Sequence, residues 1–237
     1  MRIALALALC LLAGPAAAQD LSITLGDDAG LAGRSITLLA LITLLSLVPG
    51  LAVMITCFPF IVTVLSILRQ AIGLQQAPPN MLIVSLALFL TWFVMDPVLT
   101  EAWVTGLEPL SRGAVDLPTA IPAILAPFRG FMAGRLDPDT FAALQALRSG
   151  ESSAPLDAPL SLLVPSFMLS EIQRAFEIGF LIYLPFLIID LVVAAVLMSM
   201  GMMMVPPAVV SLPFKLAFFV VADGWSLISG ALVRSYF

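Results

Sequence analysis

Six ionised side chains lie within residues 166–225, a stretch that is otherwise overwhelmingly apolar. They are Glu171, Arg174, Glu177, Asp190, Lys215 and Asp223. A charge inside a segment of hydrocarbon length costs free energy, so such residues usually face a protein interior or a water-filled path and mark function. The chemistry open to them is ion pairing between helices or subunits, or proton transfer. We therefore expect a membrane assembly with a polar interior.

The first three of these residues form a local group. Glu171, Arg174 and Glu177 are spaced three apart, which places them on one side of a helix and close enough to pair. They can act as a self-neutralising ladder that only helps the helix to pack. One acid remains in surplus, however, and needs another partner.

The other three charges have fewer neighbours. Lys215 is the only lysine of the chain, and Asp223 lies about two helical turns further along the same face. Asp190 is followed by 24 residues without a charge. Contacts between helices or subunits would give it a partner. A buried carboxylate without one is pushed towards protonation, which leaves a proton relay at Asp190 as the alternative.

Three consecutive methionines, Met202, Met203 and Met204, precede the double proline Pro206-Pro207 in this uncharged loop. A cytoplasmic loop between two spans would normally carry Lys or Arg. We therefore expect the loop to be buried among neighbouring subunits or to line a closed pore. Methionine is unbranched and adaptable, so a ring of methionines could seal a pore and still yield to a larger passenger. Alternatively, these side chains only fill a core or contact lipid.

The composition sets the class of protein. Of 237 residues, 61% are hydrophobic and 11% are charged, and the mean hydropathy is +1.13. Soluble domains are about 45–50% apolar and about 25% charged, so an integral membrane protein is indicated. A net charge of −5 with one lysine argues against nucleic-acid binding. Without histidine there is no His-based catalysis or His metal site, and no enzyme signature is present, so we expect no catalysis.

Residues 1–18 have the pattern of a secretory signal peptide. Arg2 precedes a short apolar run, and Ala16-Ala17-Ala18 forms a predicted cleavage site. The run is short for a span, which needs about 20 residues, although an uncleaved first anchor is the alternative. Cleavage would remove Cys10, leave Cys57 as the one remaining cysteine, and place the mature amino terminus outside the cytoplasm.

The remaining chain predicts an all-α protein with four hydrophobic helical segments. Residues 19–96 contain the first apolar hairpin, 97–160 an extracytoplasmic helical subdomain in which acids outnumber bases, and 161–237 a C-terminal hairpin. In the first part, we expect helices at 36–48 and 51–72, separated by a bend at Pro49-Gly50, and a third helix at 81–95 that ends at Asp96-Pro97. In the second part, we expect two short helices at 118–134 and 138–149. Asp137 is placed to cap the last of these.

Two long strings resemble the FliP family of flagellar type III secretion. One is PSFMLSEIQRAFEIGF at residues 165–180. The other is MMMVPP at 202–207, followed by SLPFKLAFFVVADGW at 211–225. The resemblance covers nearly the whole chain, and it is weakest in the subdomain 97–160. The predicted signal peptide favours the flagellar branch over the injectisome relatives.

The resemblance implies a subunit that assembles as five copies with FliQ and FliR into a conical export gate in the bacterial inner membrane, within the flagellar basal body. Its hairpins would be largely lifted out of the bilayer plane. Unfolded flagellar proteins would pass through, with FlhA and FlhB as neighbours and FliO as an assembly factor. Met202, Met203 and Met204 would form the gasket of the closed pore, and Glu171 and Lys215 would pair between adjacent subunits. The resemblance implies no cofactor.

Two other functions fit the residues alone. One is a proton- or ion-coupled transporter of small solutes that uses Glu177, Asp190 and Lys215 near the midplane of the membrane. The other is a scaffold that organises further membrane subunits without lining a path.

Overall fold

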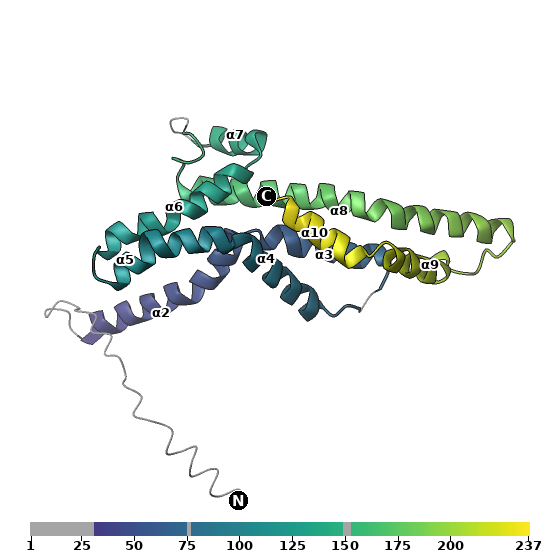
Figure 1. The fold of residues 1–237 in the computed structure, drawn as a ribbon, viewed down its shortest axis with the longest axis horizontal. Coiled ribbons are helices and arrows are strands. Elements are labelled where there is room, and N and C mark those ends of the chain that lie inside the picture. Colours follow the sequence, from purple (N-terminus) through teal and green to yellow (C-terminus); the bar gives the residue numbers. More distant parts are fainter. Residues whose placement is uncertain (1–30, 75–76, 149–152) are drawn as a thin grey trace, which may run out of the picture. The chain divides into compact units, whose positions relative to one another are not determined.

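The computed structural model describes residues 31–74, 77–148 and 153–237, so the predicted signal peptide lies outside the described residues. The chain divides into two compact units, Met1–Leu47 and Val48–Phe237. The described secondary structure is entirely helical (Figure 1). The helices are α2 (Leu31–Met54), α3 (Phe58–Ile72), α4 (Asn80–Ala102), the π-helix η1 (Trp103–Leu107), α5 (Glu108–Ser111), α6 (Leu117–Arg135), α7 (Pro138–Ala146), α8 (Leu160–Ser199), α9 (Pro207–Val221) and α10 (Gly224–Arg234).

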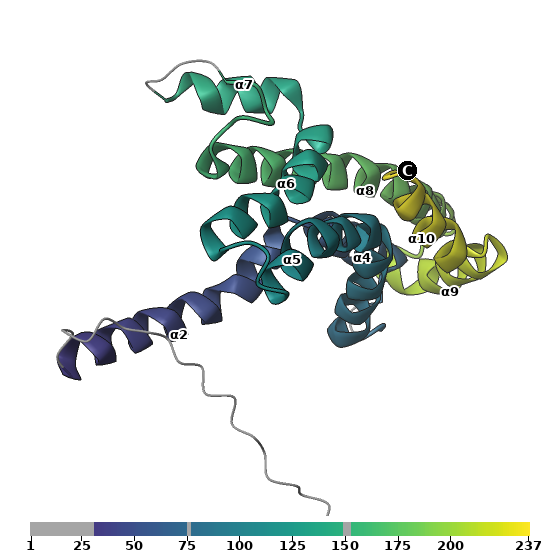
Figure 2. The same ribbon diagram turned by 60° about the vertical axis from the view of Figure 1, so that its left-hand side comes forward.

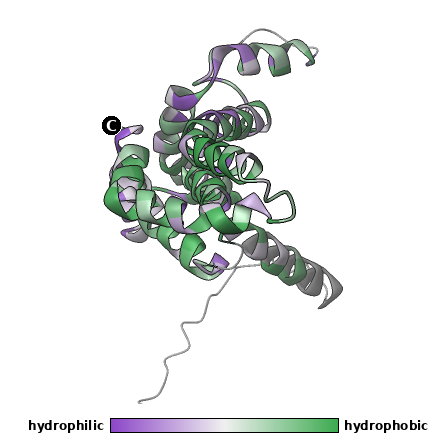
Figure 3. Cartoon of the chain, turned by 90° about the vertical axis from the view of Figure 1, so that its right-hand side faces the viewer, coloured by the Kyte–Doolittle hydropathy of each residue, from purple (hydrophilic) through white to green (hydrophobic). Residues whose placement is uncertain are grey.

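The prediction of an all-α, membrane-type protein is confirmed. Among the described residues, Asn80–Ser111 and Leu160–Ser199 are long and apolar enough to cross a membrane. The pair α9 and α10, bent by 61° at its break, would make a third span if it is counted as one, and α3 is apolar but shorter. Large apolar side chains are also exposed on many helices, and hydrophobic residues predominate along most of the described helices in Figure 3. Such faces are normal where lipid or neighbouring subunits cover them.

The predicted helix boundary at Pro49-Gly50 is wrong. Pro49 lies inside α2, and the chain breaks instead at residues 55–57, directly before α3. Pro59 occupies the first turn of α3, where a backbone N–H has no helical partner and its loss costs nothing. The position of a proline relative to the helix start therefore decides which of the two prolines marks a boundary.

The predicted helix end at Asp96-Pro97 is also wrong. α4 continues through Pro97 to Ala102 and runs on as the π-helix η1. A proline inside a helix removes one backbone hydrogen bond, and here the surrounding packing maintains the helix. Val94 and Met95 on one side of the pair and Ala102 on the other are all buried.

The core of the second unit is built around α3. This helix packs most extensively against α8 and also against α4. Its buried residues are Phe60, Ile61, Val64, Leu65, Leu68, Ala71 and Ile72. Gly179 on α8 permits the close approach, because a Cβ atom there would lie 2.4 Å from Cδ1 of Ile67. α3 is therefore the support on which the C-terminal hairpin rests.

The two short helices of residues 97–160 are confirmed as α6 and α7, with α7 ending at Ala146, earlier than predicted. α7 packs beside the start of α8, and the two views agree on this placement (Figures 1 and 2). Asp137 caps α7 as predicted, since its Oδ2 accepts hydrogen bonds from the backbone N–H of Thr140 at 2.9 Å and from the Thr140 hydroxyl at 2.7 Å.

The Asp137 cap predicts a pH dependence of α7. The hydrogen bonds from the side chain and the backbone of Thr140 hold the pKa of Asp137 below its ordinary value. A depressed folded-state pKa means that the stabilisation is present above the unfolded-state pKa of about 3.9 and is lost as the pH falls through the folded-state value. We expect the Thr140 amide to lose hydrogen-exchange protection on acidification. Asp137→Ala should show that loss already at neutral pH, and equal protection in both proteins would contradict the cap.

Candidate functional site

Glu171 on α8 is fully buried at the centre of a charge cluster. Its Oε1 lies 3.1 Å from Nε of Arg135 on α6 and 3.8 Å from Nη1 of Arg174. The hydroxyl of Tyr236 donates a hydrogen bond to Oε2. Arg135 also donates to the backbone carbonyl of Ser235 at 2.8 Å, and its guanidinium lies 4.0 Å from the centre of the Tyr236 ring. The cluster therefore ties together α6, α8 and the end of the chain.

The phenol of Tyr236 is held neutral in this cluster. Burial raises the pKa of Tyr236, and the adjacent Glu171 carboxylate raises it further. A neutral phenol keeps its proton and can donate it to the carboxylate, which is the arrangement seen. A buried carboxylate that receives hydrogen bonds from a cation and a phenol is well satisfied.

Lys215 on α9 belongs to a second cluster, which we call the Asp190 clamp and which consists of Asp190, Ser211, Lys215 and the carbonyl of Ala71. Lys215 Nζ lies 2.6 Å from Asp190 Oδ2 and donates to the Ala71 carbonyl at 3.1 Å. The Ser211 hydroxyl donates to Asp190 Oδ1 at 2.5 Å. Of the two alternatives for Asp190, the structure shows the contact between helices. The condition for a proton relay, a buried carboxylate without a partner, is not met in the single chain.

The structure does not bring Glu171 and Lys215 together within one chain, since each has other partners. Arg174 is half-buried and contacts Glu171, as its spacing predicts. Glu177 is exposed and accepts a hydrogen bond from Gln173. Asp223 is exposed at the break before α10, with a φ of 47°. Burial of Glu177 and Asp223 would need neighbouring subunits, and it stays a prediction.

Two members of the Glu171 cluster were missed by the sequence analysis. Arg135 lies at the end of α6, and Tyr236 is the penultimate residue of the chain. The surplus acid among Glu171, Arg174 and Glu177 was the available signal, because it required a further partner. Which cation would supply it depends on how α6 packs against α8, and spacing does not encode that.

The methionines form the turn between α8 and α9. We call residues 200–206 the methionine turn. Met203 and Met204 are 83% and 99% exposed, and Met202 is 41% exposed. Gly201 takes a positive φ of 71°, which a glycine adopts without strain. A core-filling role within the chain is therefore excluded for Met203 and Met204, whereas contact with other subunits or lipid is open to them.

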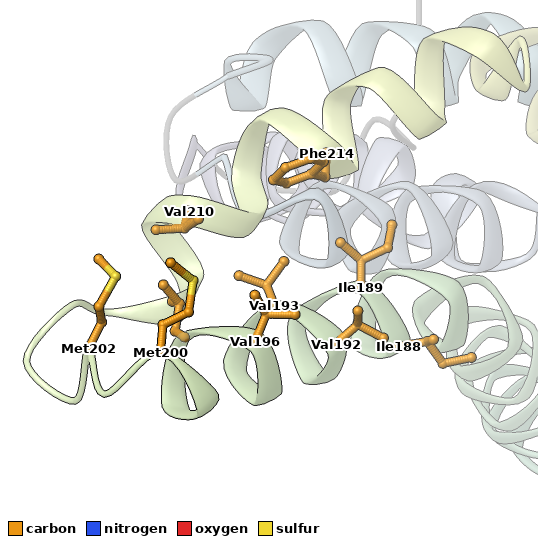
Figure 4. A pocket seen from close by; sticks show the side chains of 10 residues that line it. Ile188, Ile189, Val192, Val193, Val196, Met200, Met202, Val210 and Phe214 are labelled. Atoms are coloured by element: carbon orange, nitrogen blue, oxygen red, sulfur yellow. The ribbon is translucent and has the colours of Figure 1, made fainter.

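An apolar groove lies next to the methionine turn, between α8 and α9 (Figure 4). Its volume is about 630 Å³. The residues that line it are Ile188, Ile189, Val192, Val193, Val196, Leu197, Met200, Met202, Val210 and Phe214. The tips of the two helices are thus not sealed against each other in the single chain.

The fold and these features define a helical membrane-type protein in which the buried charges Glu171 and Lys215 are paired within the chain. Its C-terminal hairpin ends in an uncharged methionine turn. The profile of the FliP family matches residues 41–232. The chain belongs to the FliP family. It is 48% identical over 233 residues to the flagellar biosynthetic protein FliP of Caulobacter vibrioides, an alignment that covers 98% of this chain and 88% of that protein. It is 46% identical to the flagellar biosynthetic protein FliP of Agrobacterium fabrum, over 88% of this chain and 86% of that protein. It is 43% identical to that of Bacillus subtilis, over 85% of this chain and 92% of that protein.

Proposed function

We propose that this protein is the core pore-forming subunit of the flagellar type III export gate and conducts unfolded flagellar proteins across the inner membrane. The observation that carries the proposal is the methionine turn. It is uncharged, it lies at the free end of the hairpin, and it exposes Met203 and Met204 almost completely. Family membership supports the flagellar context, because the relatives are named flagellar biosynthetic proteins.

The physical case for a gasket rests on methionine itself. Its side chain is flexible and apolar, so several copies converging on an axis can close a hole without requiring one fixed geometry. An apolar constriction excludes hydrated ions by dewetting. A passing polypeptide can displace the same side chains, because their packing is not held by directional bonds. We propose that Met202, Met203 and Met204 of several copies form this closure.

The proposal extends to location and partners. The protein would assemble as five copies with FliQ and FliR, next to FlhA and FlhB and with FliO as an assembly factor, in the inner-membrane part of the basal body. Residues 1–18 would be removed on export of the amino terminus, and residues 97–160 would form the extracytoplasmic subdomain between the parts 19–96 and 161–237. The protein would act in transport and not as an enzyme.

We also propose that Glu171 and Lys215 pair between adjacent copies in the assembled gate. Both are buried in the single chain, so the pairing requires that they keep their contacts to Arg135 and Asp190 and share them with the neighbouring copy on assembly. Charge reversal tests this. Glu171→Lys and Lys215→Glu should each abolish assembly, and the double variant should restore it. A double variant that is folded, as its unfolding temperature shows, and still fails to assemble would contradict direct pairing.

The native mass of the complex tests the proposed function. The chain is co-expressed with its FliQ- and FliR-type partners and extracted in mild detergent. A discrete particle with several copies of this chain is expected. A monomer or dimer without a retained partner would overturn the proposal. The alternative, a small-solute transporter, gains no specific support, because Glu177 is exposed and Asp190 and Lys215 are bound to each other.

A further inference from the structure

We infer that Asp190 is the hinge point of the C-terminal hairpin and that it positions the methionine turn, with the helix tips beyond it free to open and close. The inference rests on the proposed function, because it assigns a control to the methionine closure. Asp190 is a positioning residue in this account and does not itself touch a passing polypeptide.

The polar contacts between α8 and α9 support a single point of attachment. In the part of the chain that the structure describes, the side-chain hydrogen bonds and ion pairs between these two helices all end on Asp190. One carboxylate oxygen accepts from Ser211, and the other faces Lys215. Such charge-assisted bonds fix direction and distance, whereas apolar contacts do not.

From the level of Asp190 to the methionine turn, the apolar groove lies between the two helices (Figure 4). Val193 and Val196 of α8 and Phe214 of α9 line it. The one hydroxyl on α8 beyond the clamp, that of Ser199, bonds back to the carbonyl of Val196 on its own helix. Apart from the methionine turn that joins them, the described residues of the two tips share no side-chain hydrogen bond or ion pair, and the groove gives the tips room to close.

Before Asp190 aromatic rings join the two helices, beside a second apolar groove of about 350 Å³. Phe186 of α8 packs edge-to-face against Phe218 of α9, with ring centres 5.8 Å apart, and lies 6.3 Å from Phe219. Lys215 links the clamp to the carbonyl of Ala71 at the end of α3, which is the centre of the core. The base of the hairpin is thus anchored and its tip is not.

The backbone of α9 is weakened at the same level. Pro213 lies inside the helix between Ser211 and Lys215. A proline there removes one hydrogen bond of the helical ladder, and kinks occur at such positions. A missing hydrogen bond in α9 beside the two polar contacts of Asp190 is the arrangement that a hinge needs.

The distance between the helix tips tests the inference without relying on conduction. Spin labels are placed by Ser199→Cys and Val209→Cys, both exposed sites, in a full-length chain with Cys10→Ser. Cys57 is buried, and burial raises its pKa to about 12, so it stays a poorly reactive thiol. The labelled chain is assembled with an excess of unlabelled chain and its FliQ- and FliR-type partners, and label distances are measured by pulsed electron paramagnetic resonance.

We expect a narrow distance distribution in the parent, a broader one shifted to longer distances in Asp190→Asn, and recovery of the narrow one in Asp190→Glu. Glu177→Gln, an exposed carboxylate change on the same helix, is the matched control and should leave the distribution unchanged. An Asp190→Asn distribution that coincides with the parent overturns the hinge. If that variant does not assemble, Ser211→Ala takes its place, and an unchanged distribution there overturns the hinge equally.

Failure of the hinge and failure of the proposed function are distinguishable. The distances report the hairpin alone, whereas ion leakage through methionine variants reports the closure. If the methionine variants leak ions and the distance distribution of Asp190→Asn equals that of the parent, the proposed gate function stands and the hinge at Asp190 is rejected.

Discussion

The variant Glu171→Ala is expected to lose about 3–5 kcal/mol of stability, because removal of one partner leaves a buried charge without compensation. Arg135 is largely buried and would keep only its bond to the Ser235 carbonyl and its contact with the Tyr236 ring. The Tyr236 hydroxyl would lose its acceptor at the same time. Since whole domains have stabilities of about 5–15 kcal/mol, the variant should unfold at a clearly lower temperature in mild detergent.

Glu177→Ala is the matched control for this prediction. It removes the same kind of side chain from the same helix at an exposed position, so its effect should stay within about 0.5 kcal/mol. A Glu171→Ala protein as stable as the Glu177→Ala protein would show that the buried cluster does not stabilise the chain.

The second large effect concerns the membrane seal. Replacement of Met202, Met203 and Met204 together by alanine should make cells that express the complex leak small ions, because alanine is too short to close an apolar constriction. The three side chains are exposed in the single chain, so their loss should leave its fold and the amount of assembled complex unchanged. Ion-dependent growth inhibition and the native mass of the complex are measured together.

Met198→Ala is the control for a general effect of methionine loss, since Met198 is an exposed methionine on α8 outside the methionine turn. It should leave the membrane tight. A tight membrane in the triple variant, with the complex present at its usual level, would contradict the gasket role.

Local features of the fold could be predicted from the sequence where short-range chemistry decides them. The cap at Asp137 and the two short helices near it were found this way, because a capping side chain acts within one turn. The prolines show the limit. Pro59 ends up at a helix start and Pro49 and Pro97 inside helices, and the difference depends on packing that short-range rules do not contain.

The contacts of the candidate site also fall into two kinds, those that helical spacing predicts and those that depend on packing. The Glu171–Arg174 contact follows from helical spacing and was predicted. Lys215 lies 25 residues from its partner Asp190, and Tyr236 lies 65 residues from its partner Glu171. Only the packing of α8 against α9 and against the C-terminus brings these residues together. Hydropathy showed that these charges need partners, and it could not choose among them.

The most direct measurement of the central claim is a crosslink between a stalled export substrate and the methionine turn. A photoreactive amino acid replaces Met203 in the assembled gate, and a second chain carries it at Leu147, an exposed position after α7. The account predicts that the substrate crosslinks at position 203 and not at position 147. Absence of a crosslink at position 203 with a substrate trapped in the complex, or equal yields at both positions, would contradict a pore lined by this chain.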